Sequence, residues 1–304
     1  MISLKPRFSR KIYLLIFILV IVVMAGVAWQ NSNAKHTKGA RVEAKYISLG
    51  GGYIFSIPAK YAVNETANPG VAVVYSQDIT TPPSAKNLDE LYSSGVVTVQ
   101  PVKQLKNSDA KTFKDYVTNT AAADLQKKLN SGSDIKFLKK GDVEAAEVSA
   151  ILNSGTVLRA AYVLDLPQPV MVVAKEKSDA FKIVSSNLED LHKTNLKSDI
   201  TLAAQAAKTV ADMLRRQDAS GIKGKGTSDF NKNVSKDQLV ANLSSSASFL
   251  NRSITVVGGS YNGQDFILQL ALEPKTKDEL PASGVLSLSK QGQNWKLNGF
   301  QLPQ

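Results

Sequence analysis

The sequence of 304 residues contains no cysteine and only two histidines. The lack of cysteine excludes disulfides, thiolate metal sites, cysteine nucleophiles and a lipid-modified N-terminal cysteine. A Ser-His-Asp triad would have to use His36 or His192. His36 lies among basic residues in a polar stretch, and His192 is expected at the end of a helix, so neither is predicted to be catalytic or to bind a metal. A metal site built from carboxylates alone would need a calcium-loop spacing, which the sequence lacks.

The carboxylates and glycines offer no recognisable catalytic pattern. Glu144 and Glu147 are three residues apart in a predicted strand, which places them on opposite faces and argues against an acid/base pair. Gly50–Gly52 and Gly221–Gly226 are rich in glycine, but neither run ends in the Lys-Ser/Thr pair of a phosphate-binding loop. The first is predicted to be a turn. The second is predicted to be a flexible loop, with an anion cradle as the alternative. We therefore predict no catalytic, cofactor-binding or metal-binding residues and no cofactor.

Acidic residues are outnumbered, and the formal net charge is +11. Lys5, Arg7, Arg10 and Lys11 account for four of the positive charges and precede a long apolar run; 33 basic and 26 acidic residues remain. Aromatic side chains are not interleaved with the lysines, as single-stranded nucleic acid binding requires. We expect a solvated basic surface that suits an anionic membrane, and no nucleic-acid partner.

Residues 12–29 are apolar and uncharged. As a helix they would span about 27 Å, close to the ~30 Å hydrocarbon core of a bilayer. The alternative is a cleaved signal peptide, although its apolar core is normally shorter, at about 7–15 residues. Arg10 and Lys11 directly precede the run, which favours an N-terminus inside the cell. We expect residues 1–11 to be a cytoplasmic tail and residues 12–29 to be a single transmembrane helix in the cell membrane, with the rest outside the cytoplasm.

A polar linker, residues 30–46, is expected to lead into a first domain of residues 47–193. Short strands are predicted at 53–57, 71–75, 96–99, 143–152, 156–164 and 169–174. Helices are predicted at 111–129, from its apolar stripe, and after Ser178, a favourable N-cap. Strands, a helix, a run of antiparallel strands and a closing helix predict an α+β sandwich.

Two segments of this domain carry a family resemblance: YIFSIPAKYAV at Tyr53–Val63 and PVMVVAKEKSDAFKIVSSNL at Pro169–Leu188. With them the domain resembles the PsbP-like families of exported proteins. That resemblance implies an exported or membrane-associated protein that supports a larger assembly, and it implies location more than activity.

Residues 194–199 are expected to link this domain to a second one at 200–304. A helix is predicted at 200–217, and a capping box at Ser235–Gln238 starts another that reaches Leu250. Strands are predicted at 254–257, 266–272, 285–290 and 295–302, with a bulge at Asn298-Gly299.

The helix segments Ala203–Leu214 and Gln238–Leu250 and the hairpin LSLSKQGQNWKLNGFQL resemble the nuclear transport factor 2-like (cystatin-like) fold. The resemblance implies a curved sheet and helices that form a cone. Its enzymatic members keep a His/Asp or Tyr/Asp set in that cone. This segment contains no histidine, so no catalytic role carries over.

The predicted fold class is therefore α+β: one transmembrane helix, a PsbP-like sandwich and a nuclear transport factor 2-like cone. We expect a membrane-anchored, extracytoplasmic binding or assembly module without catalytic activity. It would contact the bilayer through residues 12–29 and a protein partner at the cell surface. The alternative is a small-molecule or lipid carrier that holds a small apolar ligand in the C-terminal cone.

Overall fold

The computed structural model describes residues 44–79, 92, 95–102, 115, 134–140, 143–151, 157–163, 169–276, 279 and 281–303. For residues 134–140, 143–148, 150, 162 and 163 only the backbone is described. The chain divides into Met1–Val42, which lies outside these ranges, and one compact unit, Glu43–Gln304. The predicted transmembrane helix at 12–29 and the predicted helix at 111–129, of which only Asp115 is described, therefore fall outside the description. No helix within the described residues is long and apolar enough to cross a membrane.

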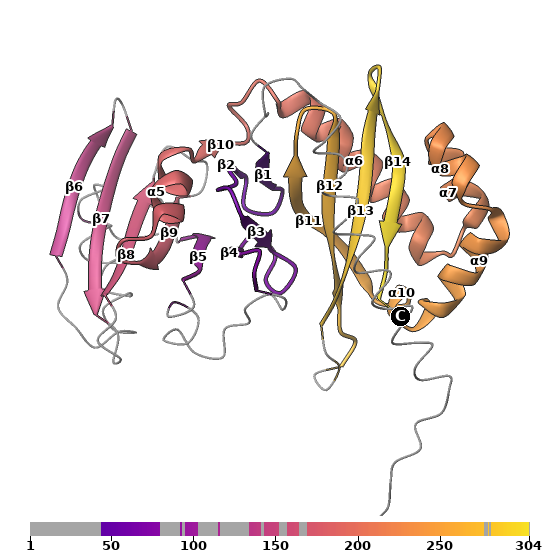
Figure 1. Ribbon diagram of the computed structural model, residues 1–304, viewed down its shortest axis with the longest axis horizontal. Coiled ribbons are helices and arrows are strands. Elements are labelled where there is room, and N and C mark those ends of the chain that lie inside the picture. Colours follow the sequence, from indigo (N-terminus) through magenta and orange to yellow (C-terminus); the bar gives the residue numbers. More distant parts are fainter. Residues whose placement is uncertain are drawn as a thin grey trace, which may run out of the picture. The chain divides into compact units, whose positions relative to one another are not determined.

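The unit is α+β and contains two antiparallel seven-stranded sheets (Figure 1). The first sheet has the order β10-β2-β1-β11-β12-β13-β14. Its strands are β1 (Lys45–Ser48), β2 (Tyr53–Ser56), β10 (Glu189–Asp190), β11 (Ser253–Tyr261), β12 (Asp265–Glu273), β13 (Ala282–Gln291) and β14 (Asn294–Gln301).

The second sheet has the order β3-β4-β5-β9-β8-β7-β6. Its strands are β3 (Tyr61–Asn64), β4 (Ala72–Ser76), β5 (Val97–Pro101), β6 (Asp134–Lys140), β7 (Val143–Ile151), β8 (Val157–Val163) and β9 (Val170–Lys175). Because alternate side chains of a strand share a face, Ala72 and Val74 of β4 and Val97 and Val99 of β5 lie together in a buried cluster with residues of β9.

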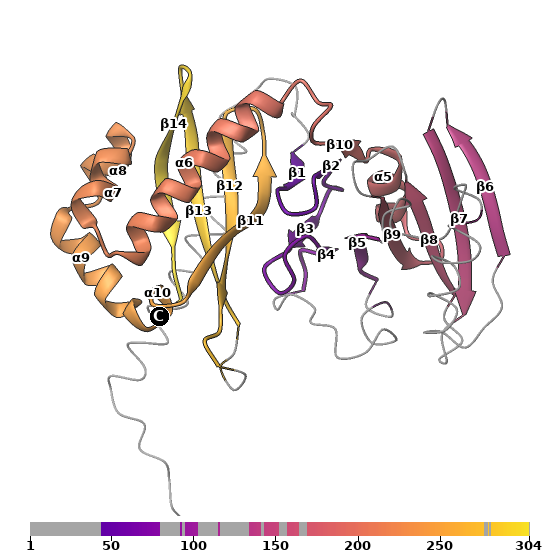
Figure 2. The ribbon, with the colours of Figure 1, turned by 180° about the vertical axis from the view of Figure 1, so that it is seen from behind.

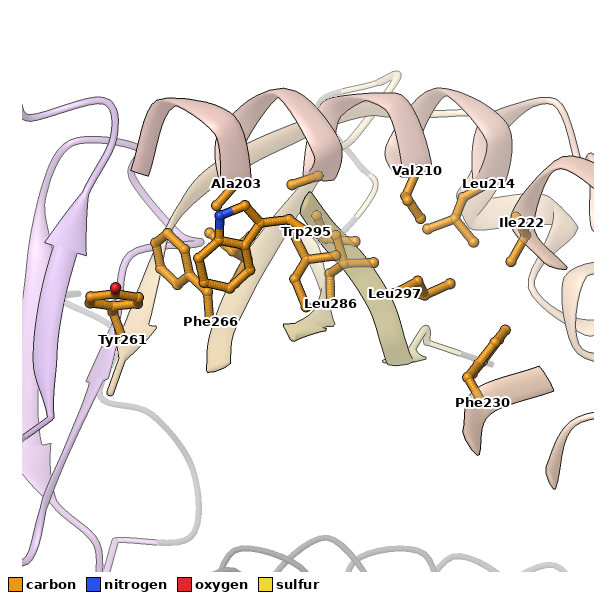
Figure 3. Close-up of a cluster of buried hydrophobic side chains, with 14 of the residues drawn as sticks. Ala203, Val210, Leu214, Ile222, Phe230, Tyr261, Phe266, Leu286, Trp295 and Leu297 are labelled. Carbon is orange, nitrogen blue, oxygen red and sulfur yellow. The ribbon is translucent and has the colours of Figure 1, made fainter. Parts of the chain in front are cut away.

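Six helices lie within the described residues: α5 (Asp179–Ser186), α6 (Lys197–Arg215), α7 (Ala219–Lys225), α8 (Ser228–Asn233), α9 (Lys236–Ser245) and α10 (Ala247–Leu250). The long helix α6 runs across strands β11–β14 (Figure 2) and buries a stripe spaced by three and four residues. Figure 3 shows this stripe, including Ala203, Val210 and Leu214, turned toward Phe266, Trp295 and Leu297 of the sheet.

The hairpin formed by β1 and β2 is buried on both faces. Because side chains alternate across a strand, Ile47 and Ile54 face the cluster beneath α6, whereas Tyr46 and Phe55 face the cluster of the second sheet. All four are at most 1% exposed. Such two-sided burial is typical of strands inside a structure rather than at its surface. The hairpin therefore contributes to both hydrophobic cores.

This hairpin pairs with the C-terminal part of the chain. Strand β1 is antiparallel to β11, with Lys45 opposite Tyr261 and Ser48 opposite Gly258. It begins at Lys45, within the stretch that we expected to be a linker. Strands β1, β2 and β10 come from segments outside the predicted domain 200–304, yet they extend the sheet of that domain. The predicted domain boundaries stay predictions, but this pairing crosses them.

Several local predictions are confirmed. Ser178 caps α5 by accepting a hydrogen bond from the Phe181 backbone N–H, and both hydrogen bonds of the Ser235–Gln238 capping box are present at the start of α9. The register of β13 and β14 shifts beside Ser287 and Leu288, whose partners are Gly299 and Leu297; Asn298 is the extra residue of the predicted bulge.

Strand β11 has a second register shift, between Val256 and Gly258, where the backbones approach closely. A Cβ atom added to Gly258 would lie 2.5 Å from the carbonyl oxygen of Ile47 in β1. That oxygen belongs to the backbone of a paired strand, which cannot move without disturbing the ladder. Glycine is therefore required at Gly258 by the contact with β1.

Gly258→Ala should lower the free energy of unfolding by about 1–3 kcal/mol, the usual cost of overpacking. Gly299→Ala is the matched control, because a Cβ atom at Gly299 meets no heavy atom within 4 Å. Urea unfolding of both variants measures the difference. Equal stability of the two variants would contradict the pairing of β1 with β11.

Candidate functional site

The most unusual side chain among the described residues is the carboxylate of Glu65. It follows β3 directly and is 1% exposed. Carboxylates are almost never fully buried unless several donors satisfy them, because leaving water is costly for a charge. The surroundings of Glu65 are therefore the first place to look for a function.

Three donors from two segments of the chain bind the Glu65 carboxylate. The Tyr46 hydroxyl donates to Oε2 at 2.8 Å. The Ser48 hydroxyl and the Gly70 backbone N–H donate to Oε1 at 2.8 Å and 2.7 Å. Tyr46 and Ser48 belong to β1 of the first sheet. Glu65 and Gly70 belong to the connection between β3 and β4 of the second sheet, with Gly70 in its turn. The carboxylate thus ties the two sheets together.

A glutamine from the C-terminal part of the chain completes the cluster. Gln269 of β12 accepts a hydrogen bond from the Glu65 backbone N–H at 2.9 Å, and its amide donates to the carbonyl of Val63. The residues in contact are thus more than 200 positions apart in the sequence. One side chain of the other sheet thus satisfies the backbone N–H of Glu65 and the backbone carbonyl of Val63.

Tyr53 adds a second connection of the same kind. Its hydroxyl donates to the carbonyl oxygens of Gly70 and Val99, each at 3.0 Å as alternative partners, and accepts from the Ala72 backbone N–H at 3.2 Å. Tyr53 lies in β2, and its partners lie beside or within β4 and β5. Burial raises the pKa of both Tyr46 and Tyr53, so these hydroxyls keep their protons and act as donors.

Burial also raises the pKa of Glu65 from 4.5 to about 7, because desolvation disfavours the charged form. The hydrogen bonds from Tyr46, Ser48 and Gly70 favour the charged form and offset part of this effect. The net result is a carboxylate that changes protonation near neutral pH inside the protein. Such a group suits either acid/base chemistry or a pH-dependent structure.

The geometry favours the structural role. Both carboxylate oxygens already accept hydrogen bonds from protein groups, and Gly258 of β11 lies against Oε2 so closely that a Cβ atom there would be 2.7 Å away. With 1% of the residue exposed, a substrate cannot reach the carboxylate. A catalytic acid needs its proton within hydrogen-bond reach of the substrate.

The residues that the sequence singled out do not gather at this cluster. His192 lies in a turn after β10, and its backbone N–H donates to Asp190 at 2.7 Å; the expected helix end is wrong, because α5 ends at Ser186. Gly221–Gly226 is not a flexible loop, since α7 extends to Lys225 and Asp218 caps it. Gly50–Gly52 does form the predicted turn.

The other predicted residues are less informative. Glu144 and Glu147 lie on β7, opposite Lys139 and Lys136 of β6, with side chains outside the described part of the structure. His36 lies outside the described residues. Among the residues that are described, no group of three or more His, Asp or Glu side chains could hold a metal ion.

A groove of about 340 Å³ lies along the outer side of α6. Helix α6 contributes Lys197, Ile200, Thr201, Ala204, Gln205 and Lys208, and the segments before it contribute Leu49, Leu191 and His192. This volume is at the small end of the ~300–1,000 Å³ range for ligand sites. The groove is the second candidate site, and it is separate from the Glu65 cluster.

Sequence patterns did not indicate Glu65, because no local motif surrounds it. Its donors are Tyr46, the last residue of the expected linker, Ser48 just after it, and Gly70 in a turn. Two of the three donors are common hydroxyl side chains. The cluster can be recognised only when the pairing of β1 with β11 and β2 is known, because that pairing places Tyr46 and Ser48 beside Glu65.

Glu65 should make the protein less stable as the pH rises. Its pKa is higher in the folded state, so the folded protein binds the proton more tightly; this stabilisation is fully present below pH 4.5 and is lost as the pH rises through about 7. At ~1.4 kcal/mol per pKa unit, the loss is about 3 kcal/mol. Glutamine stays neutral, so Glu65→Gln should remove most of this difference in the free energy of unfolding between pH 5 and pH 8, as measured by urea unfolding.

The matched control is Glu189→Gln, which removes an exposed carboxylate paired with Lys45 of the same hairpin at 3.0 Å. Exposed ion pairs contribute little, so this variant should keep the pH dependence of the unchanged protein. A Glu65→Gln protein with an unchanged pH dependence would contradict the assignment.

Comparison with models of known protein families finds no match to this chain, and comparison with curated proteins finds none either. The resemblances to the PsbP-like and nuclear transport factor 2-like families therefore remain predictions from the sequence. The α+β class with two antiparallel sheets is established by the strand pairing itself.

Proposed function

We propose that the protein is a membrane-anchored, extracytoplasmic binding or assembly module that acts through its folded surface and not through catalysis. Residues 12–29 would anchor it as a single transmembrane helix, with residues 1–11 in the cytoplasm. A protein at the cell surface would be its partner. The observation that carries the proposal is the environment of Glu65, where the most perturbed carboxylate of the described residues is closed to substrates and holds two sheets together.

The packing beneath α6 supports the same role. The inner face of the first sheet presents Phe266, Leu268, Leu286, Leu288 and Leu297, each fully buried. Helices α6–α9 cover them with further apolar side chains. Close-packed interiors of this kind leave room for few voids larger than a water molecule.

The alternative, a carrier with its pocket inside the C-terminal cone, has less support. The residues that would line such a pocket are those that pack against one another beneath α6. In Figure 3 their side chains point toward each other between the helix and the sheet.

The membrane topology can be tested in cells. Protease added outside an intact membrane should remove the chain after about residue 35 and leave a protected fragment of the first thirty-odd residues. The reason is that Lys5, Arg7, Arg10 and Lys11 resist transfer across the bilayer, while long domains cross largely regardless of charge. Protection of residues 47–304 would reverse the orientation. A protein free of the membrane that begins near Lys35 would indicate a cleaved signal peptide.

The binding role can be tested by crosslinking in cells, and the absence of catalysis by assaying the purified protein. Crosslinking followed by denaturing purification should recover a complex of defined mass, and Glu65→Gln should leave its yield unchanged because the residue is not at the surface. Hydrolase or transferase turnover by the purified protein that Glu65→Gln abolishes, with folding intact, would contradict the proposal.

A further inference from the structure

The groove along α6 combines an apolar floor with a basic rim. Leu191 and Ile200 are 7% and 2% exposed and form the floor with the half-buried Leu49 and Ala204. The lining positions on α6 follow a spacing of three and four residues, so they form one continuous face. This face adjoins the stripe that α6 buries against the sheet, and Ile200 belongs to both.

The charge of the groove has one sign. Its lining includes the cations Lys197 and Lys208, the imidazole of His192 and no acidic residue. The two acids nearest in the sequence are engaged elsewhere: Asp190 accepts the backbone N–H of His192, and Asp199 forms an ion pair with Lys290 of β13. Among the described residues, no acidic side chain forms an ion pair with Lys197 or Lys208.

The positive charge is greatest at one end. Lys197 is the first residue of α6, and Leu196 at the N-cap provides no side-chain hydrogen bond to the first turn. The N-terminus of a helix carries a partial positive charge and unpaired N–H groups, which favour an anion. His192 lines the groove only five positions earlier in the chain. Lys208 lies eleven residues along α6, about 16 Å away at 1.5 Å per residue.

We propose that this groove binds a free single-chain aliphatic acid. Its carboxylate would lie by Lys197, His192 and the start of α6, and its chain would lie over Leu49, Leu191, Ile200 and Ala204. A free chain suits the groove better than an anionic membrane surface does, because the floor is recessed and a flat bilayer does not reach buried side chains. This inference is independent of the proposed assembly role, and either can fail while the other holds.

The test uses the full chain in nanodiscs of zwitterionic phosphatidylcholine and a decanoate probe that carries a diazirine. After illumination, mass spectrometry should locate the probe on peptides that cover residues 191–208. Unlabelled decanoate should compete, and decanol, which has the same chain without the charge, should compete at least about threefold more weakly, the scale of one exposed ion pair.

Three variants separate the parts of the site. Lys197→Gln should weaken labelling about two- to fivefold, and the exposed Lys225→Gln on α7 is the matched control that should not. Lys208→Gln should have a smaller effect than Lys197→Gln, because Lys208 is at the far end. Thr201→Trp places an indole in the groove from an exposed position and should abolish labelling while circular dichroism shows an intact fold.

Several results would overturn the inference. Labelling that maps outside Leu49 and residues 191–208, or equal competition by decanol, would show that the groove does not recognise the acid. Equal labelling of the Lys197→Gln and Lys225→Gln proteins would also show that the groove does not recognise the acid. Recovery of the protein only on vesicles that contain phosphatidylglycerol, with no labelling by free decanoate, would assign the basic rim to a membrane surface instead.

Discussion

The structure depends on the burial of one short hairpin between two sheets. Strands β1 and β2 have no solvent-facing side, because each face supplies residues to a different hydrophobic cluster. At ~25 cal/mol per Å² of apolar surface, burying the aromatic side chains Tyr46, Tyr53 and Phe55 is a major source of stability for a pair of four-residue strands. Glu65 then fixes where the hairpin sits, since its partners include Tyr46 and Ser48 of the same strand.

Burying the Glu65 carboxylate has a free-energy cost that varies with pH. A carboxylate with a pKa of about 7 is ionised in part at neutral pH, and the ionised form is the one that burial disfavours. The hydrogen bonds from Tyr46, Ser48 and Gly70 keep that cost limited. Among the described residues, the junction between the sheets therefore holds a carboxylate that changes charge near neutral pH.

Local sequence signals predicted the elements well and their pairing poorly. Ser178 and the Ser235–Gln238 capping box mark the N-termini of helices through short-range hydrogen bonds. Strand β12 follows a regular alternation of side chains between its two faces. Helix α7 was missed because its two glycines and two lysines are typical of a loop, whereas Asp218 caps it and Ile222 anchors it in the core. Tertiary packing therefore outweighs the low helix propensity of this segment.

The pairing of β1 with β11 could not be predicted from the sequence, because it joins segments that lie about 200 residues apart. Lys45 and Tyr46 look like the end of a polar linker until the partner strand is known. The Glu65 cluster was missed for the same reason, since each of its contacts is ordinary and only their convergence is unusual. The groove along α6 was missed because its floor includes residues from three separate segments.

The hairpin and Glu65 make the two sheets one cooperative structure. Hydrogen exchange of the full chain at increasing urea concentration, read on peptides that cover β9 and β12, measures this most directly. We predict that both peptides lose protection at the same urea concentration and that Glu65→Ala shifts both together to a lower one. Loss of protection in β9 while β12 stays protected, or a Glu65→Ala shift confined to one sheet, would contradict the account.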